Sequence, residues 1–142
     1  MTYRIKGLER GDFAVLQAMS DEELAAENAV RVTASADRGW PCRVTLEDAK
    51  AGESLILFHH VSHDVATPYR SAYAIYVREN ADVPAEYVDC IPPVFEGRPI
   101  AFRAFDVDGM LRNAALALPG EADAKIRTLF DDQDIAYIHA HN

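Results

Sequence analysis

Cysteine, basic residues and long apolar runs are all scarce in this chain, and each shortage excludes a class of protein. The two cysteines, Cys42 and Cys90, lack CxxC spacing and are too few for a disulfide scaffold. No segment approaches the roughly 20 consecutive apolar residues that a membrane-spanning helix needs. The N-terminal residues lack the apolar core of a signal peptide. We therefore expect a cytoplasmic protein with reduced thiols.

Basic residues are outnumbered, with 14 Lys and Arg against 23 Asp and Glu and a formal net charge of -9. Such an acidic surface repels phosphate backbones and anionic lipids. The basic residues are dispersed, and no run of them indicates a hidden cationic patch. The sequence therefore predicts neither a nucleic-acid partner nor a membrane partner.

The length of 142 residues and the 49% apolar fraction are typical of one ordinary globular domain, which we place at residues 1–142. Strands do not alternate regularly with helices, so a doubly wound parallel sheet is not expected. We predict an α+β fold with a mainly antiparallel sheet, either open or curled towards a half-barrel, and two or so helices packed on it. The predicted strands, about seven, are 3–8, 29–33, 53–60, 71–79, 98–107, 110–118 and 135–141, and the helices are 20–27 and 121–131.

Three local signals support this assignment. Ser20 and Glu23 have the spacing of a capping box at a helix N-terminus. Asp108-Gly109 between two apolar runs is a strong hairpin signal. After Pro119-Gly120 the apolar period changes to that of a helix. The predicted core-facing residues of that helix are Ala122, Ile126, Leu129 and Phe130. We also expect a single helical turn at 46–49 and a loop at 84–93.

All five histidines fall into two groups, His59, His60 and His63 in one, and His139 and His141 in the other. Imidazoles at this density suit proton transfer or metal binding. The HxH spacing places the last two rings on the same face of a strand. If the last strand lies beside the end of the 53–60 strand, His60, His63, His139 and His141 would bind zinc or a similar ion. The alternative is that the terminal pair faces solvent and an inner histidine is hydrogen-bonded inside.

Tyr69, Arg70 and Ser71 form a second candidate site, where a loop meets a strand. The guanidinium of Arg70 could hold a carboxylate or phosphate through two parallel hydrogen bonds, with hydroxyl contacts from its neighbours. His60 or His63 would then be the catalytic acid or base. The alternative is that Arg70 pairs with one of the many acids of the chain and has no ligand.

Cys42 is the remaining nucleophile candidate. The neighbouring Arg43 would lower the pKa of the thiol, and a histidine of the first group could serve as its base. Nothing local indicates that pairing, so we expect a buried, unreactive cysteine.

An ordered set of short motifs across nearly the whole chain resembles the bacterial domain-of-unknown-function family numbered 1203. The resemblance implies one intact domain and a bacterial origin, and it transfers no mechanism. Family members carry a short tail with a Gly-Cys pair after the His-Asn ending, so we expect that tail to be absent or truncated here. The motifs are Pro41-Cys42-Arg43 with Leu46, Gly52-Glu53, Pro68-Tyr69-Arg70-Ser71, Ile75-Tyr76-Val77-Arg78, Arg103-Ala104-Phe105-Asp106 with Gly109, and Ala136-Tyr137-Ile138-His139 with Asn142.

Three hypotheses about function follow. The first is a protein that binds or acts on a small anionic molecule at the His59–Ser71 loop. The second is a metal-binding protein that uses both histidine groups. The third is a protein-interaction module without chemistry, in which the acidic surface meets a partner. The sequence predicts no particular cofactor, substrate, pathway or oligomeric state, and it leaves open whether the protein is an enzyme.

Overall fold

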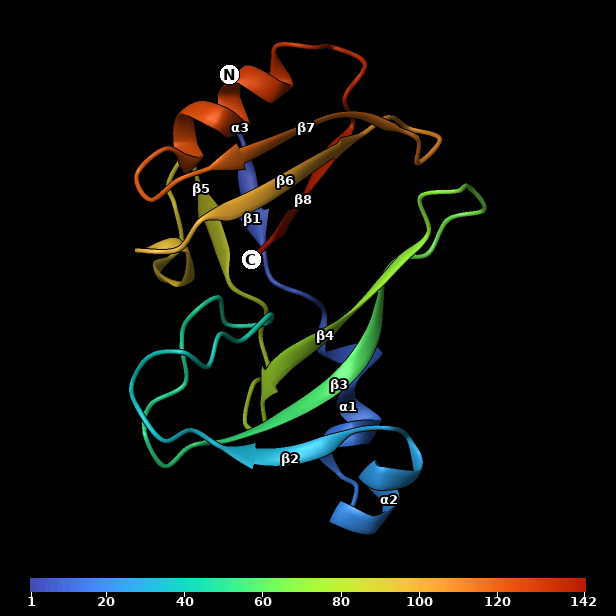
Figure 1. Cartoon of the computed structure of the whole chain (residues 1–142), viewed down its shortest axis with the longest axis vertical. Helices are drawn as coiled ribbons and strands as arrows, with labels where there is room; N and C mark the ends of the chain where they lie inside the picture. Colours follow the sequence, from blue (N-terminus) through green and yellow to red (C-terminus); the bar gives the residue numbers. More distant parts are fainter. The chain divides into compact units, whose positions relative to one another are not determined.

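The structure is a computed structural model that describes the backbone of residues 1–142 and every side chain except that of Asp12. Two short helices follow the first strand, and the third helix lies between the last two strands of the chain (Figure 1). Two 3-10 turns, η1 (Arg10–Asp12) and η2 (Pro93–Phe95), lie between them. The strands are β1 (Arg4–Lys6), β2 (Val30–Thr33), β3 (Ser54–His63), β4 (Ser71–Arg78), β5 (Glu86–Val88), β6 (Ile100–Phe105), β7 (Leu111–Ala117) and β8 (Tyr137–His141), and the helices are α1 (Ala14–Gln17), α2 (Asp21–Ala26) and α3 (Ala122–Phe130).

The strands form three small sheets, with the orders β1-β5, β2-β3-β4 and β7-β6-β8. Strand β2 pairs antiparallel with β3, and β6 pairs antiparallel with both β7 and β8. The prediction of a mainly antiparallel α+β fold is thus confirmed, although the strands are divided among three sheets rather than one. Prolines at 84, 92, 93 and 99 interrupt the connection from β4 to β6, where they supply no ladder donors.

The chain folds as two compact units, and β3 and β4 each begin in one and end in the other. The first unit comprises Met1–Arg4, Val61–Ser71 and Val88–Asn142. The second comprises Ile5–His60 and Ala72–Tyr87.

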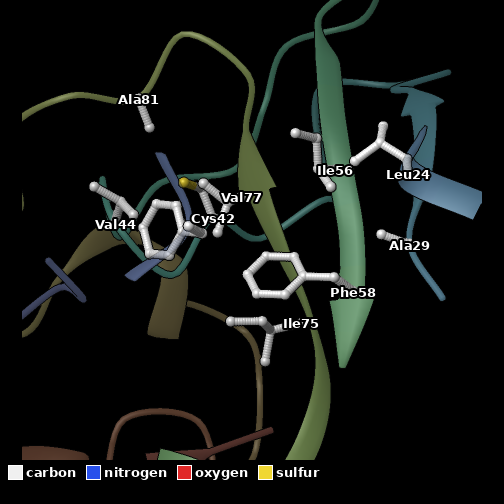
Figure 2. Packing of buried hydrophobic residues seen from close by; sticks show 10 residues of the cluster. Leu24, Ala29, Cys42, Val44, Ile56, Phe58, Ile75, Val77 and Ala81 are labelled. Atoms are coloured by element: carbon white, nitrogen blue, oxygen red, sulfur yellow. The ribbon is translucent and has the colours of Figure 1, made fainter. Parts of the chain in front are cut away.

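The core of the second unit lies between the β2-β3-β4 sheet and the segments that pack on it (Figure 2). Phe58 of β3 and Ile75 of β4 both extend into this core. Leu24 of α2 is fully buried against it. The predicted capping box is confirmed, because the Ser20 hydroxyl accepts the Glu23 amide and the Glu23 carboxylate accepts the Ser20 amide. Apolar burial and a satisfied N-terminus together explain this short helix.

Cys42 organises a tight loop in the same core. Its side chain is fully buried, and its sulfur accepts the amides of Thr45 at 3.5 Å and Arg78 at 3.3 Å. The expected helical turn at 46–49 is wrong. Leu46 instead has a φ of 55°, and Pro41 forms an antiparallel bridge with Asp48. The helical prediction failed because the loop closes through this bridge and the buried thiol, which local propensity does not include.

The β6-β7 hairpin of the first unit turns at Asp108-Gly109, as predicted. Gly109 has a φ of 79°, and a Cβ there would lie 2.9 Å from Val65 Cγ1. Asp106 Oδ1 accepts the backbone amides of Asp108 and Met110, which closes the turn. This position therefore requires glycine for both its backbone angle and its close approach.

Helix α3 packs on β7 and β6 and lies alongside β7 in Figure 1. Three of its four predicted core residues, Ala122, Ile126 and Leu129, are buried, and Phe130 is half-buried. The change of period after Pro119-Gly120 therefore predicted this helix correctly.

The remaining differences from the predicted elements are local. Strand β5 lies inside the segment expected to be a loop, and helix α1 was not predicted. Strand β3 continues to His63 rather than ending at His60. Elements of three or four residues are shorter than a periodic signal can specify. Among the described residues, the longest helix has nine residues, and no helix is long and apolar enough to cross a membrane.

We expect Cys42→Ala to lower the free energy of unfolding by about 1–3 kcal/mol, because two partly buried amides lose their acceptor and the core loses volume. Cys90→Ser is the matched control, since Cys90 is exposed, and it should change stability by less than about 0.5 kcal/mol. Urea unfolding of both variants measures this. Equal stability of Cys42→Ala and wild type would contradict the role of the thiol.

Candidate functional site

His63, the last residue of β3, is the buried polar centre of the first unit, with 3% of its surface exposed. Its Nδ1 lies 2.9 Å from the backbone carbonyl oxygen of Tyr69. Its Nε2 lies 2.6 Å from the hydroxyl of Tyr137 on β8. A carbonyl only accepts, so Nδ1 carries the proton and donates to it. In the neutral ring Nε2 then accepts the Tyr137 hydroxyl proton, and both nitrogens are satisfied.

An aromatic cluster surrounds this histidine. The ring of Phe105 on β6 lies over His63 with 3.9 Å between centroids, and the His139 ring meets His63 edge-on at 5.0 Å. Phe105 also stacks on Tyr137 at 5.4 Å. His141 extends the row, with its ring 6.2 Å from that of His139. Ring contacts of this kind each add modest stability to the area that they bury.

The register of the β7-β6-β8 sheet decides which polar groups join the cluster. Arg103 of β6 lies directly opposite His139 of β8, so their side chains share a face. The guanidinium lies 5.8 Å from the centroid of the Phe105 ring, and its NH1 donates to the Ser71 hydroxyl oxygen at 3.4 Å. That hydroxyl in turn donates to the Tyr69 carbonyl oxygen at 2.8 Å. We call Ser71, Arg103, His139 and His141 the Arg103 face.

A family model described as "Protein of unknown function (DUF1203)" matches residues 39–142. The chain belongs to the DUF1203 family. The matched segment contains every residue of the Arg103 face and of the aromatic cluster around His63. No curated protein and no solved structure matches the chain.

Tyr137 and His139 on β8 are both held neutral in this DUF1203 chain. Burial lowers the pKa of His139 from 6.5 to about 4, and the neighbouring basic groups of His63, His141 and Arg103 contribute in the same direction. Burial also raises the pKa of Tyr137, and the negative charge of Asp106 adds to the effect. At neutral pH, His139 therefore offers an uncharged imidazole, and Tyr137 keeps the proton that it donates to His63.

The four predicted metal ligands do not all share one face of their strands. His139 and His141 share a face of β8, as the HxH spacing predicts. His60 and His63 are three positions apart on one continuous strand, which directs their side chains to opposite faces. Among the described side chains, no group of three or more His, Cys, Asp or Glu could hold a metal ion. The metal hypothesis gains no support from this arrangement.

Arg70 lies at the tip of the β3-β4 hairpin, where its Nε donates to Asp64 Oδ1 at 3.1 Å. The side chains are 57% and 78% exposed, so this is a surface ion pair rather than the lining of a cleft. Tyr69 contributes its carbonyl oxygen to the site, and Ser71 contributes its hydroxyl. Arg103, and not Arg70, is the arginine that lies beside a histidine of the site, His139.

The sequence did not indicate Arg103 as a site residue, because no local pattern identifies it as one. A single arginine within an apolar strand has no spacing signal of its own. Its pairing with His139 depends on the β6-β8 register across 36 positions of the sequence, which only the folded chain supplies.

We expect Tyr137→Phe to destabilise the protein by about 1–3 kcal/mol, because Nε2 of the buried His63 loses its hydrogen-bond partner. Tyr69→Phe is the control, because the contacts of Tyr69 described above use its backbone, and it should cost less than about 0.5 kcal/mol. Chemical denaturation measures the free energy of unfolding of both variants. If Tyr137→Phe left the free energy of unfolding unchanged, the hydrogen bond to His63 would not support the fold.

The lowered pKa of His139 predicts that stability falls as the pH decreases. The unfolded chain binds a proton near pH 6.5, whereas the folded chain does so only near 4, so the unfolded state takes up more protons between these values. The contribution of His139 is complete above 6.5 and is lost as the pH falls towards 4. We compare urea unfolding at about pH 7.5 and about pH 5.5, where most carboxylates stay ionised. His139→Gln should reduce the loss of stability, and His59→Gln, at an exposed position, should not.

Proposed function

We propose that the Arg103 face binds a small anionic molecule through a carboxylate or phosphate group. The observation that supports this is the register pair of Arg103 and His139, which sets a guanidinium beside an imidazole on one face of a sheet. The proposal keeps the class of ligand that the sequence indicates and moves the anchoring cation from Arg70 to Arg103.

Arg103 suits anion recognition because its position is fixed before any ligand arrives. Its side chain is half-buried, lies over the Phe105 ring and donates to the Ser71 hydroxyl oxygen. A guanidinium has five donors in a planar fork, a geometry that matches a two-oxygen group. An ordered side chain also loses less conformational freedom on binding than one on a mobile loop.

The imidazoles of the Arg103 face suit the same ligand. A neutral His139 ring carries one N–H donor, and among the described residues no side chain hydrogen-bonds to either of its nitrogens. His141 lies next to it on the same face of β8. Because the whole chain carries a formal charge of -9, a guanidinium beside two imidazoles differs sharply from the average surface.

The acid–base role proposed for His63 fits this arrangement less well than a structural one. Both of its ring nitrogens are engaged, by Tyr69 and by Tyr137, and the ring is almost fully buried. A general base must reach the proton that it removes. If the face also performs chemistry, His139 is the better placed imidazole, because none of the described side chains holds its nitrogens.

We expect Arg103→Gln to weaken the binding of inorganic phosphate, sulfate or succinate at least tenfold, because an ion-paired, hydrogen-bonded guanidinium is worth about 1.5–3 kcal/mol. Arg70→Gln is the matched control, since it removes the same charge from the hairpin tip and should change affinity less than twofold. Isothermal titration calorimetry at constant ionic strength measures both.

Circular dichroism of each variant shows whether the fold is retained, and Arg103→Lys tests geometry, because it keeps the charge and loses the fork. Arg103→Lys should bind more weakly than wild type. If the wild-type protein binds none of the three anions, or if Arg70→Gln loses as much affinity as Arg103→Gln, the assignment to the Arg103 face is wrong.

A further inference from the structure

Strand β7 lies at one edge of the β7-β6-β8 sheet, and no described strand pairs with its outer side (Figure 1). Natural edge strands are usually protected from pairing by charges, prolines or bulges. Residues 110–118 contain no proline and a single charge, Arg112, although 26% of the whole chain is charged. The irregular pairing with β6 is confined to the start of β7, so residues 113–117 pair regularly. β7 therefore has little protection against another strand.

The outer side of β7 presents the backbone of Ala114, Leu116 and Leu118, which we call the β7 edge. The Ala114 amide donates to Asn113 Oδ1 at 2.8 Å, and the Leu118 amide donates to Glu121 Oε1 at 2.7 Å. Hydrogen-bonding directions alternate along a strand, so the Leu116 amide between them points the same way. No described side chain accepts it. The middle of the edge thus has a backbone donor and acceptor available to another strand.

The side chains of the β7 edge are apolar and exposed. Leu116 is 59% exposed and Leu118 is 55% exposed, and Ala114 is exposed as well. Strand alternation places all three on the same face. A strand that pairs with the edge therefore removes leucine surface from water, which favours association.

The charges at the two ends of the edge indicate what pairs there. Arg112 precedes the edge and Glu121 follows it, and both are exposed. The contact of Arg112 with Asp134, at 3.4 Å, is a surface ion pair of little energetic value. In an antiparallel pair the start of one strand lies beside the end of the other, so two copies of β7 bring unlike charges together. The edge is complementary in charge to an antiparallel copy of itself.

We propose that two copies of this chain pair antiparallel through the β7 edge, about a two-fold axis at Leu116. The Leu116 amide donates to the carbonyl oxygen of the partner's Leu116, and the reciprocal bond completes the pair. Ala114 lies opposite the partner's Leu118, a small side chain against a large one. The two three-stranded sheets become one continuous sheet.

This pairing is reversible, because most of its hydrogen bonds replace existing ones. The amides of Ala114 and Leu118 exchange the acceptors Asn113 and Glu121 for backbone carbonyls of the second copy, with little net gain. The Glu121 carboxylate then meets the partner's Arg112. The net gain comes from the two bonds at Leu116 and from leucine burial. An interface one strand wide is small, so the dimer dissociates on dilution.

Sedimentation equilibrium of the whole chain, from micromolar to millimolar concentration under reducing conditions, tests this. We expect monomers at the lower end and dimers at the upper end, without larger species, because a two-fold pair closes on itself. Leu116→Lys should raise the Kd of the dimer at least about tenfold, since like charges meet at the axis. Val83→Lys is the matched control at a 76% exposed residue of the other unit and should change Kd less than about twofold. Circular dichroism shows whether each variant is folded.

Charge reversal tests the direction of pairing. Arg112→Glu and Glu121→Arg should each raise Kd at least about threefold, and the double reversal should restore it. A double reversal that stays as weak as the single variants would contradict the antiparallel arrangement.

A cross-link tests the axis. Cα atoms of a hydrogen-bonded antiparallel pair lie about 5.5 Å apart, within the range that a disulfide spans. Leu116→Cys with Cys90→Ser should therefore give a disulfide-linked dimer in glutathione disulfide, whereas Val83→Cys with Cys90→Ser should not. Equal cross-linking of both would show collision rather than pairing.

Other outcomes overturn the proposal outright. These are a wild type that stays monomeric at every concentration, assemblies that grow beyond the dimer, and a dimer that Leu116→Lys leaves intact. An equal loss of dimer in Val83→Lys would mean that net charge, and not the β7 edge, controls association.

Discussion

The buried imidazole of His63 is the constraint on which the site depends. A polar ring with 3% exposure must have both nitrogens hydrogen-bonded, because an unpaired buried polar group costs about 1–3 kcal/mol. The Tyr69 carbonyl and the Tyr137 hydroxyl meet that requirement from two separate segments of the same unit. The end of β3, the turn before β4 and the start of β8 are thereby held together at one point.

The Arg103 face follows from the way β8 is held. Once Tyr137 is fixed against His63, strand alternation carries His139 and His141 to the same face, and the antiparallel register sets Arg103 opposite His139. Phe105, buried on β6, contacts both the ring of His63 and the guanidinium of Arg103. His63 is therefore committed to the scaffold, while no described side chain hydrogen-bonds to the ring nitrogens of its neighbour His139.

Sequence signals succeeded where the cause is local. The Ser20 capping box, the Asp108-Gly109 turn and the apolar stripe of α3 each depend on residues within one or two turns of chain. They failed where a distant contact overrides the local preference. Leu46 adopts a left-handed backbone conformation beside the buried Cys42, although its neighbours suit a helical turn. Strand β5 has only three residues, and pairing with β1 rather than its own pattern makes it a strand.

The sequence by itself determined the mainly antiparallel α+β class, the hairpin, the main helix and the HxH pair on one face, because each follows from chain periodicity and turn chemistry. It also pointed to the 59–71 segment, which supplies His63, Tyr69 and Ser71. Only the tertiary structure decided what those residues do. It buried His63, left Arg70 on the surface with Asp64, and brought Arg103 to His139. Strand register and burial are properties of packing between distant segments, and local sequence does not encode them.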